Sequence, residues 1–249
     1  MSNLNSSENN RKKALSSKST NIQVLLETRF SLANEWLKSG SNVLEVGSGI
    51  GLSELHLQHV NVTMTDVEWN PWLSAVITSE EIPFAEESFD AIICFEVLHH
   101  LQQPAKAIAE FSRILRPGGL IIFHEPHASF LLRLLIDITD HEYIDDAVDV
   151  YGPHSCQRGE NNWDGNNVIP DLIFNDTEKF SKHFPDLEIV KNQFCECLLF
   201  ANSGGINTKT PYIPLPRFLL NAVKLFDQFL SWVAPNIFSL ARDVIVRKS

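Results

Sequence analysis

The residues whose types and spacing best indicate chemistry lie between Val43 and Gly51. A β-branched, apolar run, Val-Leu-Glu-Val, enters the turn Gly-Ser-Gly-Ile-Gly, and a helix-compatible segment follows at once. Glycines let the backbone turn sharply and let a ligand approach without a Cβ in the way. The start of a helix offers unpaired N–H groups. The pattern predicts a buried parallel strand whose carboxyl end holds a nucleotide-type ligand.

Two carboxylates make this prediction more specific. Glu45 stands two residues before the first glycine, and Asp66 ends the next predicted strand. A carboxylate at a second strand end typically binds the two ribose hydroxyls. The third glycine comes one residue earlier than in the G-x-G-x-x-G pattern of dinucleotide-binding proteins. An NAD-dependent oxidoreductase is therefore the weaker alternative, and the sequence offers no Tyr-Lys or similar catalytic pair for it.

With these residues in view, the chain resembles the class I S-adenosylmethionine (SAM) dependent methyltransferases of the small-molecule, type 11 kind. The resemblance covers about residues 25–200. Besides the glycine turn it rests on three stretches: Ile82–Phe84 with Glu87–Asp90, then Glu96–Leu101 (Glu-Val-Leu-His-His-Leu), and then Leu115–Gly119 (Leu-Arg-Pro-Gly-Gly). It implies a transferase with SAM as its cofactor.

The resemblance also implies which residues hold the cofactor. Glu45 would help to hold the amino-acid end of SAM, the glycine turn would lie under its methionine and ribose, and Asp66 would bind the ribose diol. The family's adenine-binding Asp has no counterpart here, because Thr78 and Ser79 occupy the aligned positions. The expected cofactor-binding residues are Glu45, Gly47, Ser48, Gly49, Gly51, Asp66, Val67, Thr78, Ser79 and Phe95.

Methyl transfer from a sulfonium needs mainly alignment of the acceptor and exclusion of water. A base is required only when the acceptor atom carries a proton. Candidates follow two predicted strands: Glu96, His99, His100, His124, Glu125 and His127. We expect Glu125, His100 and His127 to be catalytic. The alternatives are that His100 anchors its loop and that Glu125 caps one. No metal site is expected, since Pro126 argues against a helix that would align His124 with His127.

Composition narrows the classes of protein and partner. The chain has 249 residues and a net charge of −11, which disfavours nucleic acid as a substrate. Four cysteines form no C-x-x-C pair, and no signal peptide or membrane-spanning apolar run is visible. These features predict a cytoplasmic protein. Residues 126–176 are strongly acidic. We expect these acidic residues to form a solvated face of the lid; the alternative is that they recognise a cationic acceptor.

Alternating elements predict an α/β fold, a Rossmann-like doubly wound and mostly parallel seven-stranded sheet with an antiparallel last strand. The expected strands lie at 43–46, 62–65, 75–77, 90–95, 120–124, 187–194 and 195–202. The expected helices lie at 22–38, 52–59, 105–115 and 177–183, the last capped by Asn175 or Asp176.

Three segments complete the expected organisation. Residues 1–20 are expected to be a disordered leader, residues 21–205 a SAM-binding domain with a lid insert at about 126–175, and residues 206–249 a helical C-terminal extension. The extension carries an apolar stripe, Leu219, Val223, Phe226, Leu230 and Val233. Such a stripe commonly packs on the core. The alternative is peripheral contact with the inner face of a membrane.

The leading hypothesis is a SAM-dependent methyltransferase that transfers a methyl group by direct displacement to a small-molecule or lipid- or glycan-linked acceptor. The alternative from another class is a non-catalytic SAM-binding or membrane-associated partner protein. The sequence determines neither the acceptor nor the oligomeric state.

Overall fold

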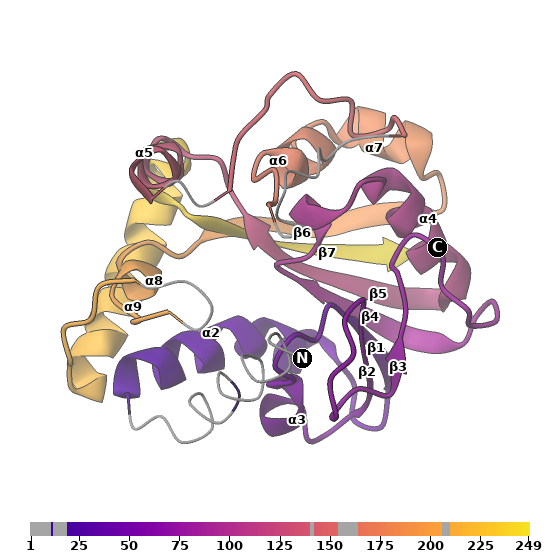
Figure 1. Cartoon of the computed structure of the whole chain (residues 1–249), viewed down its shortest axis with the longest axis horizontal. Helices are drawn as coiled ribbons and strands as arrows, with labels where there is room; N and C mark the ends of the chain where they lie inside the picture. The colour runs from indigo at the N-terminus through magenta and orange to yellow at the C-terminus, as the bar shows by residue number, and fades with distance from the viewer. Residues whose placement is uncertain (1–10, 12–18, 140–141, 154–163, 206–209) are drawn as a thin grey trace.

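A seven-stranded sheet forms the centre of the molecule, with strand order β3-β2-β1-β4-β5-β7-β6 (Figure 1). The computed structural model describes Arg11 and residues 19–139, 142–153, 164–205 and 210–249. The strands are Asn42–Val46 (β1), Asn61–Asp66 (β2), Ala75–Val76 (β3), Phe89–Phe95 (β4), Leu115–Pro126 (β5), Leu187–Cys195 (β6) and Ala241–Lys248 (β7). Neighbours from β3 to β5 pair in parallel, and β7 runs antiparallel to β5 and β6. The predicted fold class is confirmed.

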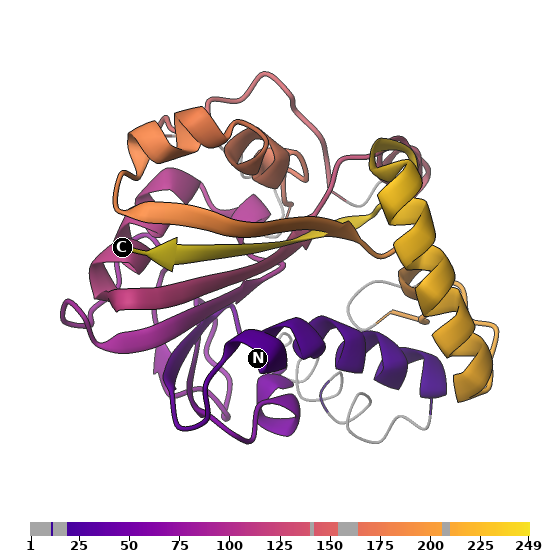
Figure 2. The ribbon, with the colours of Figure 1, turned by 180° about the vertical axis from the view of Figure 1, so that it is seen from behind.

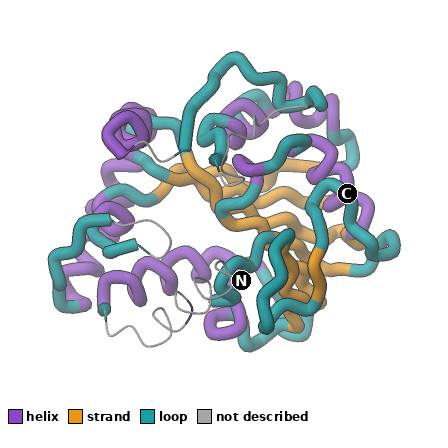
Figure 3. The backbone as a smooth tube through the Cα atoms, in the orientation of Figure 1, coloured by secondary structure: helices purple, strands orange, loops and turns teal. Residues whose placement is uncertain are grey.

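Helices cover both faces of the sheet (Figures 1 and 3). One face packs against α2 (Thr20–Trp36) and α3 (Ser53–His56), and the other against α4 (Pro104–Ile114), α6 (Ile169–Phe174) and α7 (Thr177–His183). Successive residues of a strand point to opposite faces. Accordingly, Ile92 joins the core under α4 and Ile93 the core under α2, both completely buried. The continuous apolar runs of β1 and β4 therefore reflect burial on both sides.

The predicted end of the chain requires a correction. The strand predicted at 195–202 is wrong: Cys195 is the last residue of β6, Glu196 has a φ of 55°, and a short helix, α8 (Leu198–Ala201), follows. The last strand is instead β7, inserted between β5 and β6. The prediction of a helical extension over residues 206–249 is therefore wrong at its end. Val244, Ile245 and Val246 are completely buried, as a central strand requires.

The insert after β5 also contains more structure than expected. Two helices, α5 (Phe130–Thr139) and α6, lie in the stretch that was expected to hold none before residue 177. The helix at Thr177–His183 is confirmed as α7, and the Asp176 side chain accepts a hydrogen bond from the N–H of Lys179. The helix after the glycine turn, predicted to reach residue 59, ends at His56.

The segment between β6 and β7 forms an outer wall. It contains α8, the long helix α9 (Arg217–Val233) and α10 (Pro235–Phe238), which lie at one side of the sheet beside α2 and α5 (Figure 2). None of the helices in the described part of the chain is long and apolar enough to cross a membrane. Apart from Arg11 and the residues from 19 onward, the predicted disordered leader lies outside the described residues.

Candidate cofactor and acceptor site

The glycine turn lies at the carboxyl end of β1, where the sequence pattern placed a ligand. Gly47 has a φ of 63°, and a Cβ there would come within 2.2 Å of Cγ2 of Val97. Gly49 has a φ of 50°, but a Cβ there would meet only the Gly47 carbonyl, at 3.9 Å. Gly47 therefore lets the β4 loop pack closely. Gly49 keeps open a space that a side chain would fill, as a bound cofactor requires.

Hydrogen bonds bring β2 against this turn. The N–H of Gly49 donates to Oδ2 of Asp66 at 2.8 Å, and the N–H of Glu68 donates to Oδ1 at 3.1 Å. Ser48 and Thr65 exchange two further bonds, Ser48 N to the Thr65 carbonyl at 2.9 Å and Thr65 N to Ser48 Oγ at 3.1 Å. Each carboxylate oxygen of Asp66 can accept another donor. The residues present thus fit a ribose diol at the end of β2.

Glu45 lies beneath the turn with only 6% of its surface exposed. Its Oε2 accepts a hydrogen bond from the Ser53 hydroxyl at 2.6 Å, which ties β1 to the first residue of α3. Burial raises the pKa of this carboxyl to about 7, although the bond from Ser53 opposes the rise. An ammonium group placed nearby would favour the charged form, as expected at the amino-acid end of SAM.

Two side chains that the sequence did not single out cover the glycine turn. The Trp72 indole N–H donates to the Gly49 carbonyl at 2.9 Å. Nη1 of Arg11 donates to the carbonyls of Ile50 and Gly51 at 2.6 and 2.7 Å. The Arg11 guanidinium also lies 4.7 Å from the centroid of a Trp72 ring. Nothing in the local sequence around Arg11 and Trp72 indicated this contact.

The residues expected near adenine lie at the end of β2, around β3 and at the end of β4. Val67 follows Asp66 and is 57% exposed. The Thr78 hydroxyl donates to Glu80, and Ser79 is buried. Glu80 in turn accepts from the N–H groups of Gln102 and Gln103, at 3.2 and 3.4 Å. The segment that contains Thr78 and Ser79 is thereby held beside the loop that follows β4.

Phe95 ends β4 and packs edge-on against His124, with ring centroids 5.7 Å apart. It also contacts Phe30 of α2 at the same centroid distance. The structure thus brings the glycine turn, Glu45 and Asp66 directly together, with Phe95 on the neighbouring strand.

Glu125 does not face an acceptor. Its side chain is completely buried, and Oε1 accepts the N–H groups of Val97 and Leu98 at 2.9 and 2.8 Å. Oε2 lies 2.7 Å from Nδ1 of His99. The carboxylate caps η1 (Leu98–His100), the 3₁₀ turn after β4. The geometry favours the alternative interpretation, in which Glu125 holds a loop.

His99, in the stretch Glu96–Leu101, completes this buried group. Its burial would lower its pKa, but hydrogen bonds to Glu125 and Glu142 outweigh that effect and raise the pKa well above its usual value. Nε2 of His100 lies 3.7 Å from Oε1 of Glu142. A Cβ on Gly165 would come within 2.4 Å of the His99 ring, so the insert closes tightly over both histidines. His100 therefore belongs to a loop anchor.

His127 lies in a second buried group. Its Nδ1 is 2.7 Å from Oδ1 of Asp171, and the ring packs 4.3 Å from that of Phe194. Asp171 also accepts from Nη1 of Arg242, a completely buried guanidinium on β7. His127 is only 4% exposed, so it fixes the start of the insert against β6 and β7 and is not presented to an acceptor.

A charged cluster at the carboxyl ends of β4, β5 and β6 contains groups better placed for chemistry. Arg29 of α2 makes two 2.7 Å hydrogen bonds to Glu196 and lies 3.3 Å from Oε1 of Glu96. Nε2 of His124 lies 3.4 Å from Glu196 and 3.6 Å from Glu96. Its Nδ1 is 2.7 Å from Asp243. Glu96 and His124 are among the bases expected from the sequence, whereas no sequence pattern indicates Arg29 or Glu196.

Glu96 is the member of this cluster that reaches the surface. Its side chain is 38% exposed, against 4% for Glu196 and 2% for His124. Its φ of 56° is rare for a residue with a side chain and is held by a 2.8 Å bond from its N–H to the His124 carbonyl. Burial raises the pKa of Glu96, and the nearby charges of Arg29 and His124 lower it by a smaller amount. A carboxylate in this setting can accept a proton.

Two triads among the described residues bring potential metal ligands within 4.8 Å of one another: His99, His100 and Glu142, and His124, Cys195 and Asp243. In the first triad both Nε2 atoms lie 3.7 Å from Oε1 of Glu142, and in the second Nδ1 of His124 lies 2.7 Å from Oδ1 of Asp243. Burial raises the pKa of the Cys195 thiol to about 12, which favours its protonated form.

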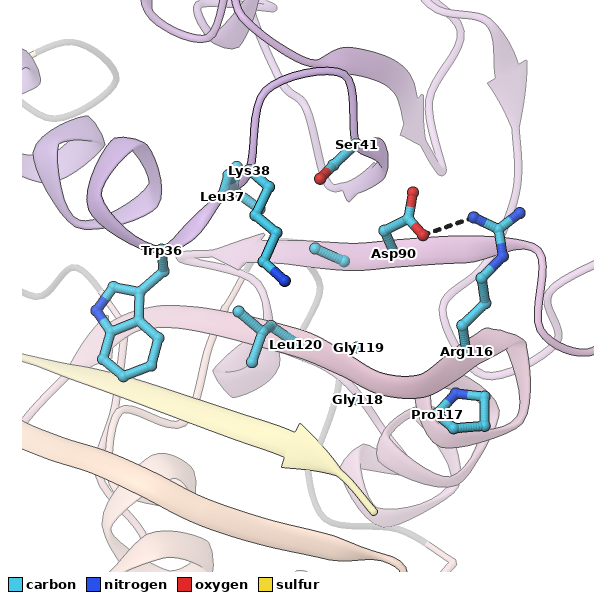
Figure 4. A pocket seen from close by; sticks show the side chains of 11 residues that line it. Trp36, Leu37, Lys38, Ser41, Asp90, Arg116, Pro117, Gly118, Gly119 and Leu120 are labelled. Carbon is cyan, nitrogen blue, oxygen red and sulfur yellow. Dashed lines mark hydrogen bonds and ion pairs between the residues drawn. The ribbon is translucent and has the colours of Figure 1, made fainter.

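A cavity of about 230 Å³ lies at the opposite edge of the sheet (Figure 4). Its lining comes from the amino ends of β4 and β5 and from the turn before β1, and Nη1 of Arg116 pairs with Asp90 at 2.6 Å. Ligands of open α/β sheets bind outside the carboxyl ends of the strands. This cavity therefore does not belong to the cofactor site.

Comparison with known proteins agrees with the geometry. A family model described as a methyltransferase domain matches residues 19–165, more than half of the chain. A ubiquinone biosynthesis O-methyltransferase from Colwellia psychrerythraea is 32% identical over 108 residues, 42% of this chain and 42% of the relative. A demethylmenaquinone methyltransferase from Tropheryma whipplei is 25% identical over 101 residues, 35% and 42% respectively. The chain thus spans about two fifths of the length of these curated relatives.

Solved structures share the fold at low identity. A SAM-dependent methyltransferase from Archaeoglobus fulgidus matches with a TM-score of 0.53 and 13% identity, over 90% of this chain and 93% of the other. A putative sarcosine dimethylglycine methyltransferase from Galdieria sulphuraria matches with a TM-score of 0.52 and 14% identity, over 90% and 86%.

The sheet order, the glycine turn and the carboxylate at the end of β2 define a Rossmann-like SAM-binding fold of class I. The chain belongs to the methyltransferase domain family, the class I SAM-dependent methyltransferases, whose cofactor is SAM.

Proposed function

We propose that the protein methylates a hydroxyl oxygen of a lipophilic small molecule by direct displacement, with Glu96 as the group that accepts the hydroxyl proton. The single observation that carries this proposal is the position of Glu96. It is a partly exposed carboxylate with a raised pKa at the carboxyl end of β4, two residues after the last buried residue of that strand.

Different residues bind the cofactor and accept the proton. When bound, SAM supplies a methyl group on a sulfonium, which becomes a neutral thioether as the C–S bond breaks and the O–CH₃ bond forms. Asp66 and the glycine turn hold the nucleoside, and Glu45 lies where the amino-acid end is expected. Glu96 takes the hydroxyl proton and releases it to solvent through its exposed side. Arg29 and His124 orient the Glu96 carboxylate at 3.3 and 3.6 Å.

The relatives support the choice of acceptor. Several are named for ubiquinone biosynthesis and methylate an oxygen by their printed names. Quinone precursors are lipophilic molecules with hydroxyl groups. The oxygen acceptor also agrees with a partly exposed base, because a hydroxyl must lose its proton during transfer. A lipid-linked glycan hydroxyl fits the same chemistry and is a second arm of the test below.

The test uses the full chain, labelled SAM and a panel of acceptors: a catechol with a short isoprenoid tail, a lipid-linked sugar, a free sugar and a primary amine. Label is expected in a lipophilic hydroxyl. Glu96→Gln should lower kcat at least 100-fold with SAM affinity by calorimetry unchanged. Glu188→Gln, on the exposed edge of β6, is the matched control. Label only in the amine, or full activity of Glu96→Gln, refutes the proposal. SAM binding without transfer to any acceptor favours a non-catalytic SAM-binding protein.

A further inference from the structure

Helix α9 presents its apolar face to solvent. The residues that form this face recur at helical spacing, and all are at least half exposed: Phe218 (71%), Leu225 (67%), Phe226 (50%), Phe229 (53%), Trp232 (81%) and Val233 (57%). A helix of a soluble protein normally turns such a face toward the core. The expectation that the tail stripe packs on the core is therefore wrong for Leu219, Phe226 and Val233, which are 41, 50 and 57% exposed.

The inward face of α9 is partly polar instead. Asp227 is 4% exposed, and its carboxylate accepts the N–H groups of Leu198 and Leu199 at 2.9 and 2.8 Å, which caps α8. Ser231, one turn later, is 5% exposed. Because buried polar groups fix the inward side, the helix cannot roll to bury its aromatic residues without losing the α8 cap. The outward apolar face is therefore built into the fold.

Helix α5 extends the same surface. Phe130, Leu134 and Ile138 lie one turn apart and are 65, 43 and 71% exposed. Although α5 is mostly Leu, Ile and Phe, none of its residues is buried. The short helix α10 contacts both α5 and α9, and Figures 1 and 2 show α5 beside one end of α9. The two apolar helices thus stand together at the outer side of the molecule.

The apolar area of this surface is large for a monomer. Five of its side chains are aromatic, and at about half of a fully exposed ring each they present roughly 500 Å². The aliphatic residues of α5 and α9 add to that area. The largest apolar patch of a typical monomer is about 300–600 Å² and is often functional.

The charges around the surface favour a bilayer over a protein partner. Asp137 is the one exposed acidic residue on α5, α9 and α10, although the whole chain has a net charge of −11. The cations Arg133, Arg217 and Lys224 flank the apolar residues; Arg133 pairs with Asp146 at 2.7 Å and Arg217 with Glu27 at 2.8 Å, so the rim of the surface is close to neutral in an acidic chain. Seven of the ten residues of α5 are Leu, Ile or Phe, and its polar residues are Arg133, Asp137 and Thr139. An aromatic-rich surface with flanking cations is typical of helices that lie at a membrane interface.

We propose that the surface formed by α5, α9 and α10 inserts shallowly into one leaflet of a lipid bilayer and docks the protein there. Helix α5 begins four residues after β5 ends, so docking brings the carboxyl edge of the sheet close to the bilayer. A lipophilic acceptor could then reach the site from the membrane. This last step rests on the proposed function, whereas docking itself does not.

The test is flotation of the purified full chain with phosphatidylcholine vesicles, with and without one fifth phosphatidylglycerol. Both vesicle types should bind the chain, and 1 M NaCl should change binding by less than about threefold, since apolar insertion is not screened. The variant Phe229→Ser/Trp232→Ser should bind at least tenfold more weakly. The matched control is Val76→Ser, which changes a residue on β3 that is 49% exposed. Circular dichroism and SAM calorimetry check that each variant folds.

Three outcomes overturn the proposal: no flotation with either vesicle, flotation that salt abolishes, or self-association by ultracentrifugation that the double variant removes without any vesicle binding. The last outcome assigns the surface to a second copy of the chain. Methyl transfer to a detergent-dispersed acceptor is measured without vesicles. A failure of docking and a failure of the proposed activity are therefore separate results.

Discussion

The buried carboxyl of Glu45 makes stability depend on pH in a direction that can be worked out. Its pKa rises from an ordinary value of 4.5 to about 7 because the side chain is 6% exposed beneath the glycine turn. The folded state therefore holds a proton over a range where the unfolded chain has lost it. The contribution is favourable at low pH and is lost as pH rises from about 4.5 to 7.

The magnitude follows from the same two values. At about 1.4 kcal/mol for each pH unit between them, this rise in pKa corresponds to about 3 kcal/mol. That is a large share of the roughly 5–15 kcal/mol that stabilises a folded domain. The cost is the energy of keeping an ionised carboxylate beneath the turn at pH 8 without a cation beside it.

Glu45→Gln isolates this effect, because the amide keeps an acceptor for the Ser53 hydroxyl but does not titrate. Urea unfolding at pH 5, 6, 7 and 8 should show the variant gaining about 3 kcal/mol over the wild type between the two extremes. Glu188→Gln, on the exposed edge of β6, should track the wild type throughout. A difference between wild type and Glu45→Gln that stays constant with pH would show that the reasoning is wrong.

The same carboxyl should couple pH to cofactor binding. The α-ammonium of SAM favours the charged form of Glu45 if it lies beside it, so binding releases a proton and affinity rises between pH 6 and pH 8. In Glu45→Gln this rise should be absent and affinity lower at pH 8. Calorimetry in buffers of different ionisation enthalpy measures the released proton directly.

Four further outcomes are expected. Asp66→Ala should weaken SAM binding at least tenfold by calorimetry, since it removes the ribose acceptor held by Gly49. Gly49→Ala should fold at a cost of about 1–2 kcal/mol, because its φ of 50° strains an Ala although the Cβ meets no atom closer than 3.9 Å, and it should weaken SAM binding by occupying the open space. Arg29→Met should lower the free energy of unfolding by about 3 kcal/mol, because the buried Glu196 loses its two hydrogen bonds to Arg29 and keeps His124 at 3.4 Å; adding Glu196→Gln should recover much of the loss in a double-mutant cycle. Glu125→Gln should destabilise the η1 loop by a similar amount in urea unfolding.

The sequence predicted those strands and helices whose place in the fold follows from the local residue pattern. Strands β1 and β4 are mostly apolar, β2 alternates Val62 and Met64 with threonines, and the helix at Thr177–His183 has its cap at Asp176. It failed where position along the chain and position in space separate. The run Val244-Ile245-Val246 has strand character, yet 45 residues (196–240) separate β7 from β6. Nothing local indicates that it returns to the centre of the sheet.

The cofactor site was predictable for the same reason that the acceptor site was not. Gly49, Asp66 and Glu45 lie within 22 residues of one another, and a spacing pattern captures their contact. The cluster around Glu96 joins residues from α2, β4, β5 and the end of β6, and its members are up to 167 residues apart. The only local feature that distinguishes Glu196 is that a charged residue stands between two cysteines, Cys195 and Cys197. Its partner, Arg29, stood in an ordinary amphipathic helix.

Two candidate bases lie at neighbouring strand ends: Glu96 just after β4 and Glu125 near the end of β5. The sequence favours Glu125 as the residue that faces the substrate, but in the structure Glu96 is the exposed one. Both follow buried apolar runs, so their chemical settings look alike. Burial separates them: Glu125 has both oxygens committed to the N–H groups and the histidine of η1, whereas the left-handed backbone at Glu96 turns its side chain toward the surface. A carboxylate whose two oxygens accept hydrogen bonds from its own loop stabilises that loop. A carboxylate with a partly exposed side chain can accept a proton from another molecule. The fully buried Glu125 thus positions the turn that carries His99, and Glu96, just after the strand beside it, is the proton acceptor that we propose.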